Sequence, residues 1–137
     1  MTPSIRISTD AGEVDLDWLH PALSERAYWA LGRSRPTVER AVANSLCFSA
    51  FDGGRQVGFA RVVTDQATFA WVCDVFVDDD RRGRGIGRRL MEAIVADPRL
   101  AGLKRTVLAT SSPGFYTRFG FEPLDRPERW MLRSGPG

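Results

Sequence analysis

Three glycines at alternate positions, Gly83, Gly85 and Gly87, follow an apolar stretch and precede an amphipathic one. Glycine lets the backbone approach a ligand closely, and the first turn of a helix offers unpaired N–H groups at the positive end of its dipole. A strand-to-helix turn of this kind can bind an anion, most simply a phosphate or pyrophosphate. The alternative is an ordinary turn with a basic surface, because Gly-rich turns are common.

The spacing of these glycines excludes two familiar phosphate-binding loops. A dinucleotide-binding fingerprint needs a third glycine where Arg88 stands. A P-loop needs Gly, four residues and then Gly-Lys-Ser/Thr, a string that this chain lacks. The pattern that remains is Arg82-x-x-Gly85-x-Gly87.

This pattern resembles the acyl-CoA loop of the Gcn5-related N-acetyltransferases, the GNAT family, which reads Gln/Arg-x-x-Gly-x-Gly/Ala. The resemblance implies that acetyl-CoA is the cosubstrate and that loop amides hold its pyrophosphate. It also implies that the preceding strand pairs with the pantetheine arm through backbone groups. The residues so implicated are Val75, Phe76 and Val77 on the strand, and Arg82, Gly83, Arg84, Gly85, Ile86, Gly87 and Arg88 in the loop.

The chain departs from the family pattern in two places. Asp79-Asp80-Arg81 stands where many members carry Pro-Glu-Tyr, which adds two negative charges that Arg81 and Arg82 are expected to offset. Thr110-Ser111 replaces an asparagine that often follows the next strand.

A second motif lies downstream, where the pair Phe115-Tyr116 precedes a Phe119-Gly120-Phe121 turn. It is similar to the second GNAT signature, which implies that Tyr116 is the general acid. Aminolysis of a thioester expels a thiolate, and a well-placed phenol of pKa about 10 can protonate a thiolate whose conjugate acid has a pKa of about 8.5. We also expect the dipole of a short helix to favour the ionised form of Tyr116 slightly. The alternative is a packed aromatic ring with its hydroxyl at the surface.

A carboxylate, Asp74, lies inside the apolar strand before the loop. The family often uses a carboxylate on this strand, directly or through water, to take the proton of the amine. Apolar neighbours are expected to raise the pKa of Asp74, which suits a base. The alternative is that Asp74 satisfies a backbone group or pairs with an arginine such as Arg61. Asp65, in a turn, is a weaker candidate.

Aromatic residues, Tyr28, Trp29 and Trp71, are candidates for the wall of the acceptor pocket. The first two fall where the family's variable first helices meet the acceptor site. Large aromatics more often belong to the core, which is the alternative for all three.

The elements that must position these residues follow from periodicity and turn signals. We predict strands over 5–8, 46–51, 56–63, 69–77, 106–110, 121–124 and 130–132, and helices over 14–29, 37–45, 85–96 and 115–119. Tight turns make the middle strands antiparallel, and the unit around residue 85 is a parallel crossover. Strand 69–77 is expected to be buried on both faces. The prediction is an α/β (α+β) fold in one domain, 1–137, with a mixed, mostly antiparallel sheet and helices on both faces, which is also the order of the GNAT fold.

The composition and net charge limit the binding partners and the cellular compartment expected for this domain. The 137 residues carry a net charge of only +2, so a nucleic-acid-binding face is not expected, although the arginines at 81–89 form a local cluster. No apolar run is long enough to span a membrane, and the N-terminus lacks the apolar core of a signal peptide. Two isolated cysteines and a single histidine, His20, indicate a reducing, cytoplasmic setting and no metal site.

The sequence therefore favours an acetyl-CoA-dependent N-acetyltransferase that acts on a small primary amine or an amino-acid-like molecule by direct transfer. One alternative is a CoA-binding sensor or regulatory module that has lost turnover. Another is an anion- or nucleic-acid-binding domain that uses the arginine cluster. The resemblance also implies a homodimer as one assembly, since this fold often dimerises through its last strands.

Overall fold

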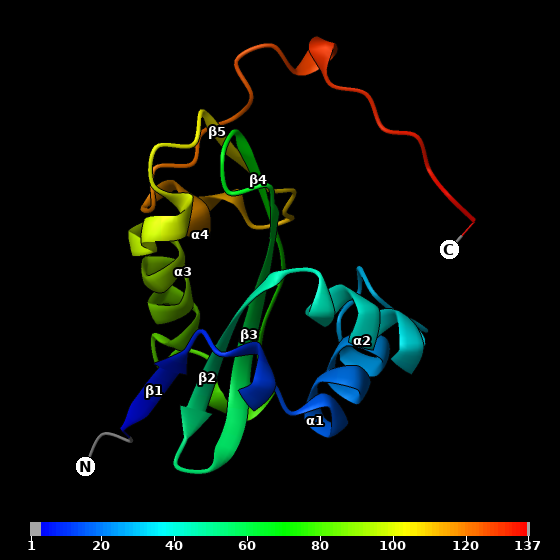
Figure 1. Ribbon diagram of the computed structural model, residues 1–137, viewed down its shortest axis with the longest axis vertical. Helices are drawn as coiled ribbons and strands as arrows, with labels where there is room; N and C mark the ends of the chain where they lie inside the picture. The colour runs from blue at the N-terminus through cyan, green and yellow to red at the C-terminus, as the bar shows by residue number, and fades with distance from the viewer. Residues whose placement is uncertain (1–3, 137) are drawn as a thin grey trace.

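A five-stranded sheet whose strands follow their order in the chain forms the centre of the computed structural model, which describes residues 4–136 (Figure 1). Strands β1 to β4 pair antiparallel, and β5 pairs parallel with β4 across the predicted crossover. The strands are β1 (Ile5–Ser8), β2 (Leu46–Asp52), β3 (Arg55–Thr64), β4 (Phe69–Val77) and β5 (Arg105–Val107). The predicted mixed sheet is confirmed.

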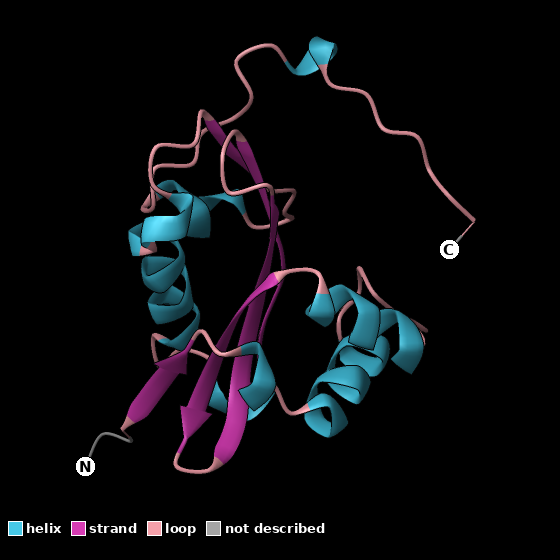
Figure 2. Ribbon diagram, viewed as in Figure 1, coloured by secondary structure: helices cyan, strands magenta, loops and turns pink. Residues whose placement is uncertain are grey.

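Helices cover both faces of the sheet, as predicted (Figure 2). Helix α3 (Ile86–Ala96) lies on one face, whereas α1 (Leu16–Pro21) and α2 (Arg35–Ala43) lie on the other. Helix α4 (Pro113–Thr117) follows β5. Short 3₁₀ turns occupy Ala11–Glu13, Asp79–Arg81, Pro98–Leu100 and Pro127–Arg129.

The helix predicted over 14–29 is divided at Pro21. This residue ends α1, and a π-helical turn, Ala22–Arg26, follows it. Proline has no N–H to donate and its ring crowds the preceding turn, so the regular helical ladder does not pass through it unchanged. The chain thereby turns early enough to bring Tyr28 and Trp29 toward the sheet.

Two apolar clusters, one on each face, hold the helices to the sheet. Ile86, Leu90 and Ile94 of α3 pack over β2 and β3, where Gly58 leaves room for the helix. On the other face, Leu19 and Val38 of the first helices pack with Phe59 and Phe76. The first cluster anchors the start of α3, and the second anchors the segment around residue 30.

The prediction that strand 69–77 is buried on both faces is correct for part of the strand. Ala70 and Val72 belong to the cluster under α3, and Phe76 belongs to the cluster on the other face. Trp71 is the exception, because its side chain is on the face opposite α3 and the residue is 39% exposed.

The predicted last strands, 121–124 and 130–132, are absent from the described residues, and β5 ends at Val107 rather than at residue 110. Pro123 and Pro127 remove two donors from this segment, and no neighbouring strand of the same chain pairs with it. The chain instead leaves the body after Phe121 and runs outward to its end (Figure 1).

Candidate active site

A cleft of about 910 Å³ opens where β4 and β5 separate. The two strands pair only from Phe69 with Arg105 to Trp71 with Val107, and then diverge. The edge of β4 from Cys73 to Val77 therefore has no strand partner on this side. The cleft is bounded by β4, the glycine loop, the start of α3, residues 108–112 and α4.

The structure brings the predicted site residues together around this cleft, with one exception. Arg84 is exposed and does not line it. The predicted residues that do line it are Tyr28, Trp29, Trp71, Asp74, Val75, Phe76, Val77, Arg82, Gly83, Gly85, Ile86, Gly87, Arg88 and Tyr116.

The glycine loop presents free amides. Gly83 and Gly85 have φ angles of 78° and 77°, in the left-handed region that favours glycine. Gly85 precedes α3 with no side chain capping the helix. Within residues 4–136, the amides of 83–88 donate no hydrogen bond, so six N–H groups are available at the positive end of an 11-residue helix.

The added aspartates beside this loop are paired, as expected. The Arg82 guanidinium lies 3.0 Å from Asp79, while Arg81 lies 3.9 Å from Asp80 and 2.5 Å from Asp52. These ion pairs reduce the negative charge next to the loop.

Asp74 lies in a β-bulge. The register between β3 and β4 shifts between Phe59 and Arg61, and Asp74 has a φ of 52°, which is uncommon for a residue with a side chain. The residue is only 4% exposed, and its two carboxylate oxygens accept hydrogen bonds from Trp29 Nε1 at 2.8 Å, Arg33 Nη1 at 2.8 Å and Arg61 Nε at 2.9 Å. The bulge therefore aims this carboxylate at the segment around residue 30.

These contacts overturn the expectation of a raised pKa. Burial alone would raise the pKa of Asp74, but the Arg61 and Arg33 charges and the donated hydrogen bonds together hold it below the usual carboxyl value. The pairing with Arg61, which the sequence left as an alternative, is present. Arg33 was missed, because a single arginine in a turn after Trp29 gives no sequence signal of a site.

The end of the cleft beside residues 28–33 combines aromatic walls with excess positive charge. The Tyr28 and Trp29 rings pack edge to face at 5.0 Å, and the Tyr28 hydroxyl donates to Ser111 Oγ at 2.9 Å. Tyr28, Trp29 and Trp71 are all more than a third exposed, so they are wall residues rather than core. Two guanidiniums, Arg33 and Arg61, share the single Asp74 carboxylate.

Tyr116 lies in α4, between Phe115 and Phe121, whose rings are 4.9 and 6.1 Å from its own. Burial, with a smaller contribution from Tyr28, raises the pKa of Tyr116. The expected shift toward the ionised form is therefore wrong, because burial outweighs the dipole of a five-residue helix. Tyr116 holds its proton at neutral pH.

Two other groups near the cleft lack the properties of a nucleophile or base. Burial raises the pKa of the Cys73 thiol to about 11, so Cys73 is protonated at neutral pH. His20 Nε2 lies 3.2 Å from the Arg33 carbonyl oxygen and does not line the cleft.

Among residues 4–136, no three His, Cys, Asp or Glu side chains are grouped as metal ligands. No described helix combines the length and the apolar character that a membrane crossing needs.

The sheet order, the opening between β4 and β5 and the loop of free amides define an acyltransferase class of protein. A family model described as an acetyltransferase (GNAT) domain matches residues 43–123, and the chain belongs to the GNAT family. Acetyl transfer is thus its activity in general terms, with acetyl-CoA as the family's cosubstrate.

Individual proteins similar to this chain are consistent with its membership of the family. A GNAT protein of Xanthomonas campestris pv. campestris is 45% identical, with a TM-score of 0.95 over 100% of this chain and 97% of that one, so the likeness includes residues 122–136. A Gibberella zeae protein that bears an acetyltransferase name is 26% identical over 127 residues, 77% of this chain and 71% of its own. Serotonin N-acetyltransferase 2 of Oryza sativa subsp. japonica is 41% identical over 70 residues, 50% of this chain and 35% of its own.

Proposed function

We propose that this protein transfers the acetyl group of acetyl-CoA to the primary amine of a small acceptor that also carries an anionic group. Transfer is direct, with both substrates bound in the cleft at once. The observation that carries this proposal is the arrangement of one cleft, which has free loop amides at one end and the Arg33–Asp74–Arg61 cluster at the other.

The residues at the loop end fit acetyl-CoA. The amides of 83–88 would hold the pyrophosphate, and no atom lies within 4 Å of a Cβ built at Gly83 or Gly85, so the cradle is open. The unpaired edge of β4 along Val75, Phe76 and Val77 would take the pantetheine amides as a strand takes a neighbour. Acetyl-CoA, when bound, supplies the acetyl thioester.

The cluster at the other end supports an acceptor with an anionic group. Two guanidiniums against one carboxylate leave a net charge of +1 in a partly buried place, where an anion is stabilised. The same charge disfavours the ammonium form of a bound amine and lowers its pKa, which releases the proton that must leave before attack. The aromatic walls suit an acceptor with an apolar body.

Asp74 then acts by holding Arg33 and Arg61 in place. A carboxylate with a lowered pKa and three donors is a weak base for an ammonium group, so we propose that the amine loses its proton to solvent at the open mouth of the cleft. Tyr116 keeps its proton on the hydroxyl oxygen and gives it to the departing sulfur.

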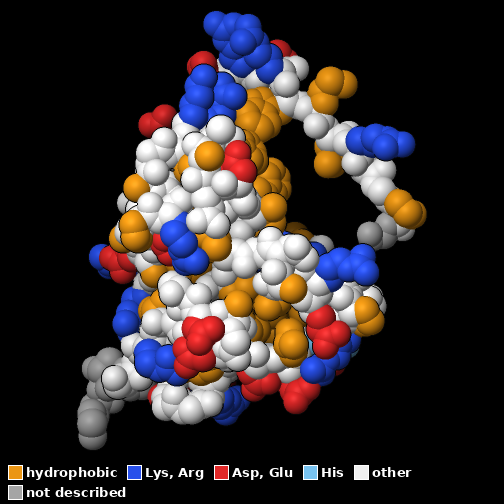
Figure 3. Space-filling model, viewed as in Figure 1, with side chains coloured by type: hydrophobic (Ala, Val, Ile, Leu, Met, Phe, Trp, Pro, Cys, Tyr) orange, Lys and Arg blue, Asp and Glu red, His pale blue; other side chains and the backbone are white. Residues whose placement is uncertain are grey.

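The other two hypotheses have less support. The rice relative is named for N-acetylation of serotonin, which is an amine, and it matches half of this chain. Acidic and basic side chains intermix on the face seen in Figure 3, unlike the broad basic face of a nucleic-acid-binding protein. The two cysteines are free, which supports our placing the protein in a reducing, cytoplasmic setting.

Thermal unfolding with increasing acetyl-CoA tests the loop. We expect a rise in Tm that grows with ligand concentration, about 2.7 kcal/mol of added stability at a hundred times Kd. Gly85→Glu should abolish the rise by filling and charging the cradle, whereas Arg84→Glu, outside the cleft, should keep most of it. If acetyl-CoA leaves the Tm of the unaltered protein unchanged, neither transfer nor sensing through CoA is possible.

A thiol-release assay tests the end of the cleft that holds Arg33, Asp74 and Arg61, by comparing acceptors that differ only in a carboxylate. Aromatic amino acids should be acetylated with a kcat/KM at least about tenfold above that of the same molecules without the carboxylate, since an ion pair in a partly buried site contributes more than 1 kcal/mol. Arg33→Gln should remove this preference. Binding of acetyl-CoA without turnover on a broad amine panel would instead favour the sensor.

A further inference from the structure

A buried carboxylate outside the cleft stands where β4 ends. Asp78 is the first residue after the strand; it is 3% exposed and does not line the cleft. Its backbone N–H donates to the Val57 carbonyl oxygen at 2.9 Å, and its own carbonyl oxygen accepts from the Arg81 N–H at 2.9 Å. The backbone of Asp78 is therefore bonded to β3 on one side and to the turn that leads into the glycine loop on the other.

The side chain of Asp78 joins this point to the first helices. Trp18 Nε1 of α1 and Arg26 Nη2 of the π-helical turn both donate to Asp78 Oδ1, at 3.0 and 3.1 Å. The same two side chains contact Phe76, with the Trp18 ring edge to face at 6.1 Å and the Arg26 guanidinium 5.1 Å from the ring centroid. Because Phe76 lines the cleft, the first helices brace both the strand beside the cleft and the residue before the loop.

The carboxylate of Asp78 is only half satisfied. Its Oδ2 is buried and accepts no hydrogen bond from the described residues, and Arg55 Nη2 lies 3.9 Å away, beyond hydrogen-bond reach. A buried charged oxygen without a donor costs free energy. Stability alone therefore does not account for a carboxylate here, whereas a need to hold two donors at one point does.

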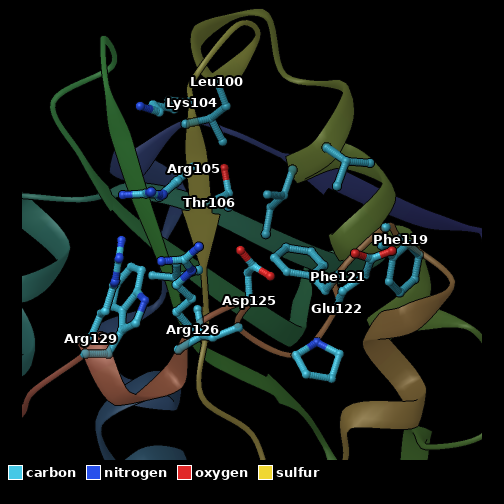
Figure 4. Close-up of a pocket in the computed structure, with 17 residues that line it drawn as sticks. Leu100, Lys104, Arg105, Thr106, Phe119, Phe121, Glu122, Asp125, Arg126 and Arg129 are labelled. Atoms are coloured by element: carbon cyan, nitrogen blue, oxygen red, sulfur yellow. The ribbon is translucent and has the colours of Figure 1, made fainter.

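The glycine loop lies between Asp78 and α3, and α3 is packed more fully at its start than at its end. Ile86 and Leu90 are buried in the core. The last turn of α3, in contrast, borders a second cavity of about 880 Å³, across which Leu100 and Phe119 lie (Figure 4). A fixed point on the strand side confines the loop at both ends, and Asp78 supplies it.

We propose that Asp78, through Trp18 and Arg26, is a positioning residue that fixes the glycine loop for the pyrophosphate of acetyl-CoA. This inference rests on the proposed function in taking acetyl-CoA as the ligand of the loop. Backbone amides bind an anion best when they already point to one place before it arrives. A shift of the strand end would move the loop amides together and weaken binding at the pyrophosphate alone.

Binding of two thioesters tests this role. Asp78→Ala should raise the Kd of acetyl-CoA, measured by titration calorimetry, at least about tenfold, because misplaced groups lose much of their effect. The Kd of S-acetylpantetheine, measured by NMR titration, should not change, since this thioester has no pyrophosphate. Trp18→Phe disturbs the fold less, because it keeps an aromatic ring and removes the Nε1 donor. It should show the same selective loss to a smaller degree and add nothing to Asp78→Ala, since both act at one carboxylate.

Val38→Ala is the matched control for a loss of stability. Val38 is 1% exposed and belongs to the same apolar cluster as Phe76, but its side chain has no donor for Asp78. This variant should lower the Tm and change the Kd of acetyl-CoA by less than about twofold, as expected for independent sites. Equal loss of both thioesters in the Asp78 and Trp18 variants, or unchanged binding of acetyl-CoA to them, overturns this inference and leaves the proposed function standing. A wild type that does not bind acetyl-CoA overturns both.

Discussion

Asp74 is the point at which the fold and the proposed chemistry meet. Its bulge conformation and its three donors place two guanidiniums side by side in the acceptor end of the cleft. The shared carboxylate holds both arginines, and Arg61 is held further by its hydrogen bond to Ser45 Oγ at 3.2 Å. In the proposed function Asp74 therefore serves both the fold and the chemistry, and its removal should affect stability and activity.

We expect Asp74→Asn to lower the free energy of unfolding by about 3 kcal/mol at neutral pH, because it leaves two partly buried cations without their anion. The pKa of Asp74 is lower in the folded state, so its contribution is present above the usual carboxyl range and is lost as pH falls through the folded pKa. Urea unfolding between pH 3 and pH 8 measures this.

The variant should lose the part of the acid destabilisation that Asp74 causes, and the difference between variant and wild type should shrink as pH falls. Glu25→Gln, an exposed carboxyl without an ion pair among the described residues, is the control and should follow wild type at every pH. A constant difference down to pH 3 would mean that Asp74 does not stabilise the fold through its charge.

Tyr116→Phe keeps the ring and its packing against Phe121 and removes only the hydroxyl proton. We expect kcat to fall about 100-fold, the lower end of what a general acid contributes, with the Tm rise on acetyl-CoA kept. Because burial raises the pKa of Tyr116, the wild-type rate should not decline from its ionisation at neutral or mildly alkaline pH. Tyr28→Phe is the matched control and should change KM more than kcat.

At the scale of single residues, the sequence did not predict the electrostatic environment of the site. The resemblance of two motifs to those of the GNAT family was enough to predict that Asp74 and Tyr116 lie in one cleft. The direction of each pKa shift could not be predicted from the sequence. It depends on side chains such as Arg33 and Phe121, which the fold brings close to Asp74 and Tyr116. A pattern along the chain does not include these neighbours.

At the scale of elements, the position of the glycine loop depends on how closely α3 lies on the sheet. A Cβ at Gly58 of β3 would stand 3.1 Å from Ile86 and 3.3 Å from Leu90, both on α3, and 3.2 Å from Ala50. These distances are tighter than ordinary contact. The loop precedes α3 directly, so any outward shift of the helix moves the amides of 83–88.

We therefore expect Gly58→Ala to destabilise the protein by about 1–3 kcal/mol and to weaken acetyl-CoA binding, although the residue does not line the cleft. Gly54→Ala, where a Cβ would meet no atom within 4 Å, should change stability by less than about 0.5 kcal/mol. Urea unfolding and the Tm rise with acetyl-CoA give both quantities. Equal stability of the two variants would show that a Cβ at Gly58 fits beneath α3 without moving the helix.

The elements were more predictable than their ends. Strands 46–51, 56–63 and 69–77 and helix 85–96 each match a structural element within two residues, because each has a clear apolar period and a turn signal. The strands at 121–124 and 130–132 were not formed, although their pattern was as good. Their apolar residues match a strand, but a strand also needs a neighbour, and residues 4–136 of the same chain do not supply one.

At the scale of the whole molecule, the cleft and the exposed segment 122–136 lie in different parts of the fold, and this separates two contributions to stability. Ligand at the cleft stabilises each copy by itself. In the homodimer that the GNAT resemblance implies, contacts of this segment with a second copy stabilise a chain only through its partner, so their contribution depends on protein concentration. Contacts of the segment with its own chain would contribute the same amount at every concentration.

This difference predicts how Tm responds to dilution. For wild type we expect Tm to rise with protein concentration, because unfolding releases two chains from one dimer. The variant with Met131→Asp and Leu132→Asp should have a Tm that does not change with concentration, and the two proteins should converge on dilution, since their bodies are the same. Calorimetry over a hundredfold range of concentration measures both curves. A constant gap between them would mean that segment 122–136 acts within its own chain, and coincident curves at high concentration would mean that it does not contribute to stability at all.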